Sequence, residues 1–124
     1  MNIPKDHQVI MPYLIVKGAD KFLDFIKQVF NANELSINKA ENGVIVNAQF
    51  MIGDSTIMFS ESRKPWPVEN AGLFIYVANA DETFQQALKN GAEVVADLEN
   101  HDYGRSGGVR DPFGNTWWIT QAGA

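Results

Sequence analysis

Gly107–Thr120, which reads GGVRDPFGNTWWIT, decides the fold of this chain. Its centre, Asp111–Gly114 (DPFG), is typical of a tight turn. Proline fixes its own φ, aspartate accepts a hydrogen bond from the backbone two residues on, and glycine takes a positive φ. Side chains alternate along the strand that follows, so Trp117 and Trp118 lie on opposite faces of a sheet. We predict that one tryptophan enters a core and that the other meets whatever covers the far face.

The residues ahead of this hairpin predict a strand, a helix and a second strand. Leu73–Val77 is rich in β-formers, and Asn79 is a suitable N-cap for a helix. Ala92–Ala96 predicts the next strand. A polar loop that contains Tyr103 and Arg105 would then lead into the hairpin.

The first half of the chain shows the same order of elements. Val9–Lys17 predicts a strand, and the spacing of apolar residues from Ala19 onward predicts a helix that ends at Asn31. Three further strands are expected, at Glu34–Ala40, Val44–Met51 and Ser55–Ser60. Asn47 and Gln49 share the more polar face of the middle one of these strands.

The two halves align at a fixed offset of 61 residues. Val16 falls on Val77, Ala19 on Ala80, and the Gly53 turn on the Gly114 turn. The sequence therefore predicts an α+β domain made of two tandem βαβββ modules, at about 8–61 and 71–121. Residues 62–70, which contain Pro65, Trp66 and Pro67, are expected to link them.

Composition excludes several classes of function. The net charge of −5, with no cluster of basic residues, argues against nucleic-acid binding. No apolar run is long enough to span a membrane, and the N-terminus lacks signal-peptide features. The absence of cysteine excludes disulfides, thiolate metal sites and a cysteine nucleophile. These features favour a cytoplasmic protein.

The repeated modules, the opening Pro12–Val16 (PYLIV) and the closing Arg105–Asn115 (RSGGVRDPFGN) resemble the vicinal oxygen chelate superfamily. This is the group of glyoxalases, bleomycin-resistance proteins and extradiol dioxygenases, and the chain is most similar to its PhnB-like branch. The resemblance implies curved mixed sheets, each with a helix on its convex side, that enclose a cavity. It also implies a homodimer.

That superfamily usually holds one divalent metal through His, Glu or Gln on the first and last strands of each module. The corresponding positions here are Met11, Ile57, Gly72 and Trp118. None of these side chains suits a hard divalent cation, and a shift of one residue offers no usual ligand either. We therefore expect neither a metal nor another cofactor.

An aromatic-lined cleft with a few amides and an arginine is typical of small-molecule sites. The candidate ligand-binding residues share an expected position on the inner strand faces or on the loop above them; they are Tyr13, Asn47, Gln49, Phe74, Tyr76, Tyr103, Arg105, Arg110 and Trp118. Each of them also has a purely structural interpretation, in the core or at the seam between modules.

Three functions remain open from the sequence. The first is a metal-independent protein that sequesters an aromatic or amphipathic small molecule, with no catalytic residue. The second is a metal-dependent lyase, isomerase or transferase of the glyoxalase or dioxygenase type, with ligands at other positions. The third is a structural or regulatory dimer whose cavity is filled by its own side chains.

Overall fold

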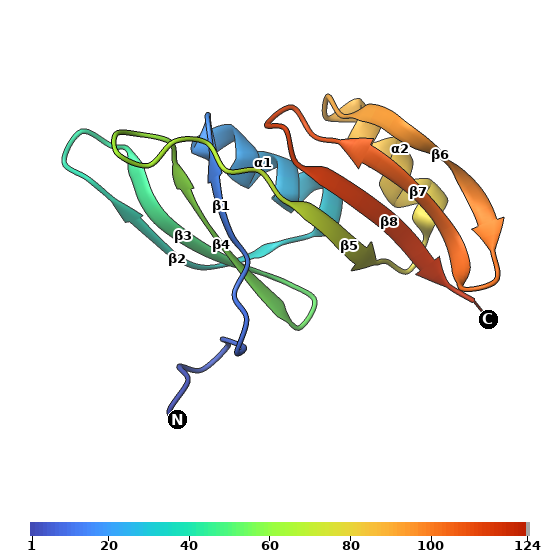
Figure 1. Cartoon of the computed structure of the whole chain (residues 1–124), viewed down its shortest axis with the longest axis horizontal. Coiled ribbons are helices and arrows are strands. Elements are labelled where there is room, and N and C mark those ends of the chain that lie inside the picture. The colour runs from blue at the N-terminus through green and yellow to red at the C-terminus, as the bar shows by residue number, and fades with distance from the viewer. Residues whose placement is uncertain (124) are drawn as a thin grey trace. The chain divides into compact units, whose positions relative to one another are not determined.

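The computed structural model describes residues 1–123, which divide into two compact units. The first unit is Met1–Glu69, and the second begins at Asn70. Each contains one helix and one four-stranded mixed sheet in the order βαβββ (Figure 1). The prediction of two βαβββ modules is confirmed.

In the first unit, β1 (Tyr13–Val16) leads into α1 (Ala19–Phe30). The strands β2 (Asn33–Lys39), β3 (Ile45–Ile52) and β4 (Ser55–Glu61) follow. The sheet order is β1-β4-β3-β2, with β1 parallel to β4 and the other pairs antiparallel.

The second unit repeats this topology. Its elements are β5 (Gly72–Tyr76), α2 (Ala80–Lys89), β6 (Glu93–His101), β7 (Gly104–Arg110) and β8 (Thr116–Ala122). The sheet order is β5-β8-β7-β6, with β5 parallel to β8. Strand β6 is longer than predicted, because residues expected in a polar loop continue the antiparallel ladder with β7.

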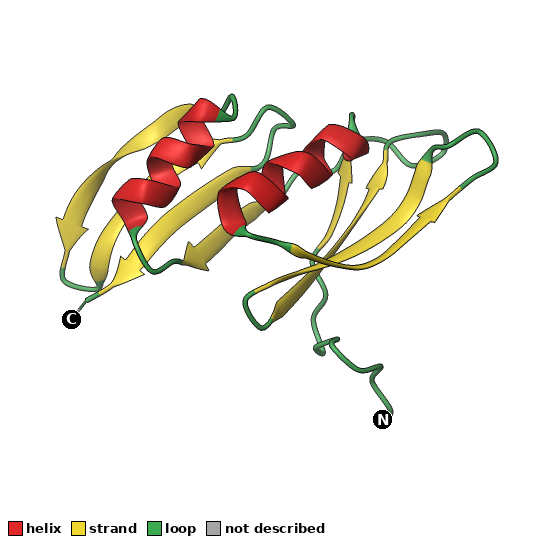
Figure 2. Ribbon diagram, turned by 180° about the vertical axis from the view of Figure 1, so that it is seen from behind, coloured by secondary structure: helices red, strands yellow, loops and turns green. Residues whose placement is uncertain are grey.

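Each helix covers one face of the sheet of its own unit (Figure 2). In the first unit, Phe22 of α1 packs edge-on against Phe59 of β4, with ring centroids 4.8 Å apart. In the second unit, Phe84 of α2 is buried, as are Trp117 and Ile119 of β8. We call the sheet face opposite the helix the open face of that unit.

The two helices begin with the same kind of contact. Asn79 caps α2 as predicted, because its side chain accepts a hydrogen bond from the Glu82 amide at 3.1 Å. The side chain of Gln121, in β8, also accepts from the Ala80 amide at 2.9 Å. In the first unit the Glu61 carboxylate accepts from the amides of Gly18 and Ala19. A carboxylate suits this position because a helix N-terminus carries partial positive charge.

The turn of the closing hairpin is built as the sequence predicts. Asp111 Oδ1 accepts a hydrogen bond from the Phe113 amide at 2.9 Å, and Gly114 has φ +96°. The same carboxylate accepts from the Asn115 amide at 2.9 Å and from the Trp117 indole Nε1 at 2.8 Å. Asp111 is therefore buried, at 3% exposure, with its oxygens satisfied by N–H donors.

The expected constant offset of 61 is wrong at the last strand of each module. Tyr13 is the neighbour of Met58, and Phe74 is the neighbour of Trp118. Tyr13 and Phe74 are 61 apart, but Met58 and Trp118 are 60 apart. The chain from Phe74 to Trp118 is one residue shorter than the chain from Tyr13 to Met58, and the register differs by that one residue. Ile57 is thus not the structural counterpart of Trp118.

Residues 62–69, expected to be a linker, are held along the first unit. Ser62 donates its amide hydrogen to the Val16 carbonyl at 2.8 Å. Glu69 and Ile15 exchange both of their backbone hydrogen bonds, at 2.9 and 3.1 Å. The division between the units therefore falls after Glu69 rather than across the whole segment. Within residues 1–123, neither helix is long and apolar enough to cross a membrane.

We expect Asp111→Ala to lower the free energy of unfolding by about 2–4 kcal/mol, because several buried N–H donors lose their acceptor. Urea denaturation followed by far-UV circular dichroism measures this change. Asp54→Ala is the matched control, since Asp54 is exposed in the corresponding turn of the first unit and should change stability by less than about 0.5 kcal/mol. Equal losses in the two variants would contradict this role of Asp111.

Candidate ligand-binding faces

The two neighbouring tryptophans point to opposite sides of the second sheet. Trp117 is 2% exposed and donates its indole N–H to Asp111 on the buried side. Trp118 is 37% exposed and lies on the open face. The prediction that one tryptophan enters the core and that the other faces outward is confirmed. The strand register then fixes the neighbours of Trp118, which are Phe74 on β5 and Gly108 on β7.

Aromatic side chains gather on this open face. Phe74 and Tyr76 meet edge-on, with ring centroids 5.4 Å apart. Tyr103, in the turn between β6 and β7, reaches to 6.5 Å from Phe74 and stacks on His101 at 4.9 Å. Phe74, Tyr76 and Tyr103 are 53%, 66% and 52% exposed. We call this group the aromatic patch; its members are Phe74, Tyr76, His101, Tyr103 and Trp118.

Gly108 lets the Trp118 ring lie directly against β7. A Cβ atom added at Gly108 would be 2.6 Å from Cζ3 and 2.7 Å from Cε3 of the indole. Contacts this short are not tolerated, so any larger residue at position 108 would displace the ring. Gly108 was not among the predicted site residues. Its position two residues before Arg110, in a strand with alternating faces, was the available signal.

The two candidate arginines of β7 lie on opposite faces. Arg110 is exposed and lies opposite Thr116 in the register, on the same face as Gly108 and Trp118. Arg105 was expected in a loop above the site, but it is part of β7. Its side chain lies on the helix side of the sheet. There its Nε and Nη2 donate to the two carboxylate oxygens of Asp81 in α2, at 2.9 Å each.

The Arg105–Asp81 ion pair explains the two pKa shifts in this unit. The hydrogen bond from Arg105 lowers the pKa of Asp81, and the same bond raises the pKa of Arg105. Both groups are solvent-accessible, so the pair adds little to stability. Arg105 therefore contacts the first turn of α2 and does not line the open face.

The open face of the first unit has a more polar character. It carries Tyr13 and Met58, which are register neighbours, together with Asn47 and Gln49. The Gln49 amide donates to the Asn47 oxygen at 3.4 Å. The two amide side chains thus lie on the predicted face of β3. The alternate residues Ala48 and Phe50 lie on its opposite face and enter the core.

The N-terminal segment of the chain lies against this polar face. Gln49 Oε1 is 2.8 Å from Nε2 of His7. The side-chain Nε2 of Gln8 donates to the Thr56 carbonyl at 2.7 Å, and the Thr56 hydroxyl donates to the Asp6 carbonyl. Sequence reasoning missed these contacts because residues 6–8 belong to no regular element. As a result, Gln49 already has two partners from its own unit.

The residues at the metal positions of the family do not suit a metal. Met58 takes the place of Ile57, since Ile57 is buried opposite Phe50 on the helix side. The set is therefore Met11, Met58, Gly72 and Trp118. Thioethers, a hydrogen atom and an indole are poor donors for a hard divalent cation. Across residues 1–123, no group of three His, Cys, Asp or Glu side chains could hold a metal ion.

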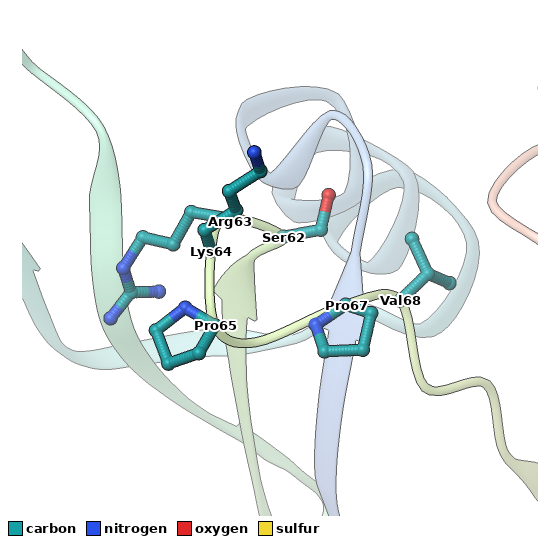
Figure 3. Close-up of a pocket in the computed structure, with 6 residues that line it drawn as sticks. All are labelled: Ser62, Arg63, Lys64, Pro65, Pro67 and Val68. Atoms are coloured by element: carbon teal, nitrogen blue, oxygen red, sulfur yellow. The ribbon is translucent and has the colours of Figure 1, made fainter.

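A hollow of a different kind lies within the loop of residues 62–68 (Figure 3). Arg63 and Trp66 exchange backbone hydrogen bonds across this loop. The hollow is lined by Ser62, Arg63, Lys64, Pro65, Pro67 and Val68. The hollow is open to solvent and is formed by consecutive residues. No aromatic side chain lines it, so it does not match the aromatic-lined site that the sequence predicts.

Known proteins resemble this chain in sequence or in fold. A relative at 32% identity is protein Mb0911c of Mycobacterium bovis, with 90% of this chain and 82% of that protein covered. The PhnB protein from Bacillus cereus superposes with a TM-score of 0.72 at 18% identity, over 93% and 100% of the two chains. TnmS3, an antibiotic-binding protein from Streptomyces sp. CB03234, superposes with a TM-score of 0.68 at 19% identity, over 94% and 100%.

The family model of the Glyoxalase/Bleomycin resistance protein/Dioxygenase superfamily matches residues 6–119, nearly the whole chain. The match includes both βαβββ units and the hairpin that places Trp118. The chain therefore belongs to the glyoxalase/bleomycin resistance protein/dioxygenase superfamily.

Proposed function

We propose that this chain binds a small aromatic or amphipathic compound on the open face of its second unit, without a metal. The observation that supports this proposal is the aromatic patch. Its rings are large and apolar, and three of them are more than half exposed. Contiguous groups of exposed apolar side chains are found at binding sites more often than elsewhere on a protein surface.

The patch suits a flat ring system. Trp118 lies against the β7 backbone over Gly108, and Phe74 is its neighbour on β5. Offset or edge-on contact between aromatic rings contributes about 0.5–1.5 kcal/mol beyond the area that is buried. The hydroxyl groups of Tyr76 and Tyr103 add polar ends, so that an amphipathic ligand could pair its own polar atoms.

Family relatives make sequestration a reasonable activity for this fold. TnmS3 is described as an antibiotic-binding protein and shares the architecture. The side chains at the metal positions give no support to the metal-dependent alternative, since none is a usual ligand. We therefore propose binding without catalysis, and we assign no catalytic residue.

The polar face of the first unit has a secondary part in this proposal. Tyr13, Asn47 and Gln49 remain candidate ligand contacts, but His7 and Asn47 already engage Gln49. A ligand on that face would compete with the N-terminal segment. In residues 1–123, the ring contacts of Phe74, Tyr76 and Tyr103 are with one another and with His101, all members of the aromatic patch, and we therefore prefer this patch as the site.

We expect Trp118→Ala to weaken binding of a neutral aromatic probe such as N-phenyl-1-naphthylamine about 30-fold, the effect of losing a central aromatic contact of about 2 kcal/mol. Titration calorimetry measures the affinity without depending on tryptophan emission. Trp66→Ala is the control, since Trp66 is an exposed tryptophan in the loop of residues 62–68. The wild-type affinity should be the same with and without EDTA.

Other results of this titration would contradict the proposal. Undiminished binding in Trp118→Ala would place the site elsewhere. An affinity that disappears in EDTA and returns with zinc or manganese would favour the metal-dependent alternative. The lack of any binding across a panel of aromatic compounds would favour a structural or regulatory role.

We expect Gly108→Ala to fold normally and to bind the same probe several-fold more weakly, because the new methyl group pushes the Trp118 ring off β7. Gly72→Ala is the matched control. Gly72 also lies on the second sheet, but a Cβ atom there would meet nothing within 4 Å. Calorimetry of both variants, with thermal melting as a folding check, gives the comparison; equal affinities would show that the ring position is unimportant.

We also propose a homodimer, which the family resemblance implies. Sedimentation equilibrium of the full chain should then give a mass near twice 13.8 kDa. A mass of one chain at micromolar concentration would remove the dimer from the proposal and leave the binding face unaffected.

A further inference from the structure

We propose that the ligand of the second unit is an aromatic anion, with its ring on Trp118 and Phe74 and its charged group at Arg110. This inference rests on the proposed binding function and adds a chemical class to it. It is carried by the position of Arg110 on the same sheet face as the rings, and by the lack of a partner for its charge.

The strand register orders the open face into rows. One row runs Phe74, Trp118 and Gly108, across β5, β8 and β7. The neighbouring row runs Gly72, Thr116 and Arg110 across the same strands. Adjacent strands are about 4.8 Å apart, and same-face neighbours on one strand are about 7 Å apart. A ligand whose ring covers the row of Phe74, Trp118 and Gly108 can therefore place a charged group, a few Å from that ring, over the row that contains Arg110.

Arg110 has a free charge on this face. Within residues 1–123 it makes no ion pair, and its guanidinium donates no hydrogen bond. The nearest carboxylate in the register is Glu93, directly opposite on the edge strand β6, and the two form no ion pair. By contrast, Arg105 on the other face of β7 has its charge neutralised by Asp81.

The row that holds Arg110 has room for a ligand group. Gly72 presents no side chain, and a Cβ atom there would meet nothing within 4 Å. Thr116 lies between Gly72 and Arg110 in the register, and its hydroxyl can donate a hydrogen bond. A planar guanidinium pairs with a carboxylate or sulfonate through two parallel N–H donors. A small oxyanion on the ligand thus has a cation and a hydroxyl within one row.

The negative net charge of the protein does not prevent this. At physiological salt the field of a distant charge is screened over about 8 Å, so the adjacent guanidinium determines the local potential. The rings of the patch are phenyl, indole, phenol and imidazole groups, the imidazole being that of His101 beside Tyr103. Of the residues that β5, β8 and β7 contribute to the two rows, Arg110 alone carries a charge, and the row continues on the edge strand β6 with Glu93.

Two fluorescent dyes test this inference directly. 8-Anilinonaphthalene-1-sulfonate and N-phenyl-1-naphthylamine share their rings and differ by the sulfonate. We expect the sulfonate dye to bind wild-type protein about tenfold more tightly, as one charge-assisted contact of about 1.4 kcal/mol provides. This preference should shrink as salt is raised. Arg110→Met should remove it, so that the two dyes bind with equal affinity.

Arg105→Met is the matched control, because it removes a cation from the same strand but from the opposite face; it should keep the preference. Trp118→Ala should weaken both dyes. Thermal melts of each variant establish that it is folded. A preference that persists in Arg110→Met, or that Arg105→Met abolishes, would overturn the inference. If the neutral dye binds and the sulfonate adds nothing, the anion is wrong and the binding function stands; if neither dye binds, both fail.

Discussion

The buried carboxylate of Asp111 fixes the arrangement on which the candidate site depends. It accepts hydrogen bonds from the Phe113 and Asn115 amides and from the Trp117 indole. The Asn115 side chain in turn accepts from the backbone amide of Ala71, just before β5. One carboxylate thus closes the hairpin turn and draws Trp117 into the core, while Asn115 joins the turn to β5. Because side chains alternate, Trp118 must then lie on the open face, beside Phe74.

The two units share a topology but have open faces of different chemistry. Both begin their helix against an acceptor from the last strand, Glu61 in one unit and Gln121 in the other. The first open face is lined by amides and is contacted by the N-terminal segment through His7. The second keeps its rings exposed and carries a free guanidinium. The two units thus share a scaffold and differ in the chemistry of their open faces, and we propose the second unit as the binding surface.

Local chemistry allowed much of the fold to be predicted. The helix that ends at Asn31, the Asn79 cap and the Asp111 turn each follow from one or two residues whose contacts are short in sequence. The faces of Trp118, Asn47 and Gln49 follow from alternation. Register did not follow: the second module is one residue shorter between its first and last strands, so the counterpart of Trp118 is Met58 and not Ile57. The roles of Arg105, His7 and Gly108 depend on partners in other elements, which spacing alone does not reveal.

The central claim is that an aromatic ligand covers Trp118 and leaves the other two tryptophans untouched. The three indole N–H resonances, from Trp66, Trp117 and Trp118, can be followed by ¹H–¹⁵N NMR during titration with an aromatic compound. We expect a large shift for Trp118 and little change for Trp66 or for Trp117, whose indole N–H is held by Asp111. A shift confined to Trp66, or no indole shift at saturation, would contradict it.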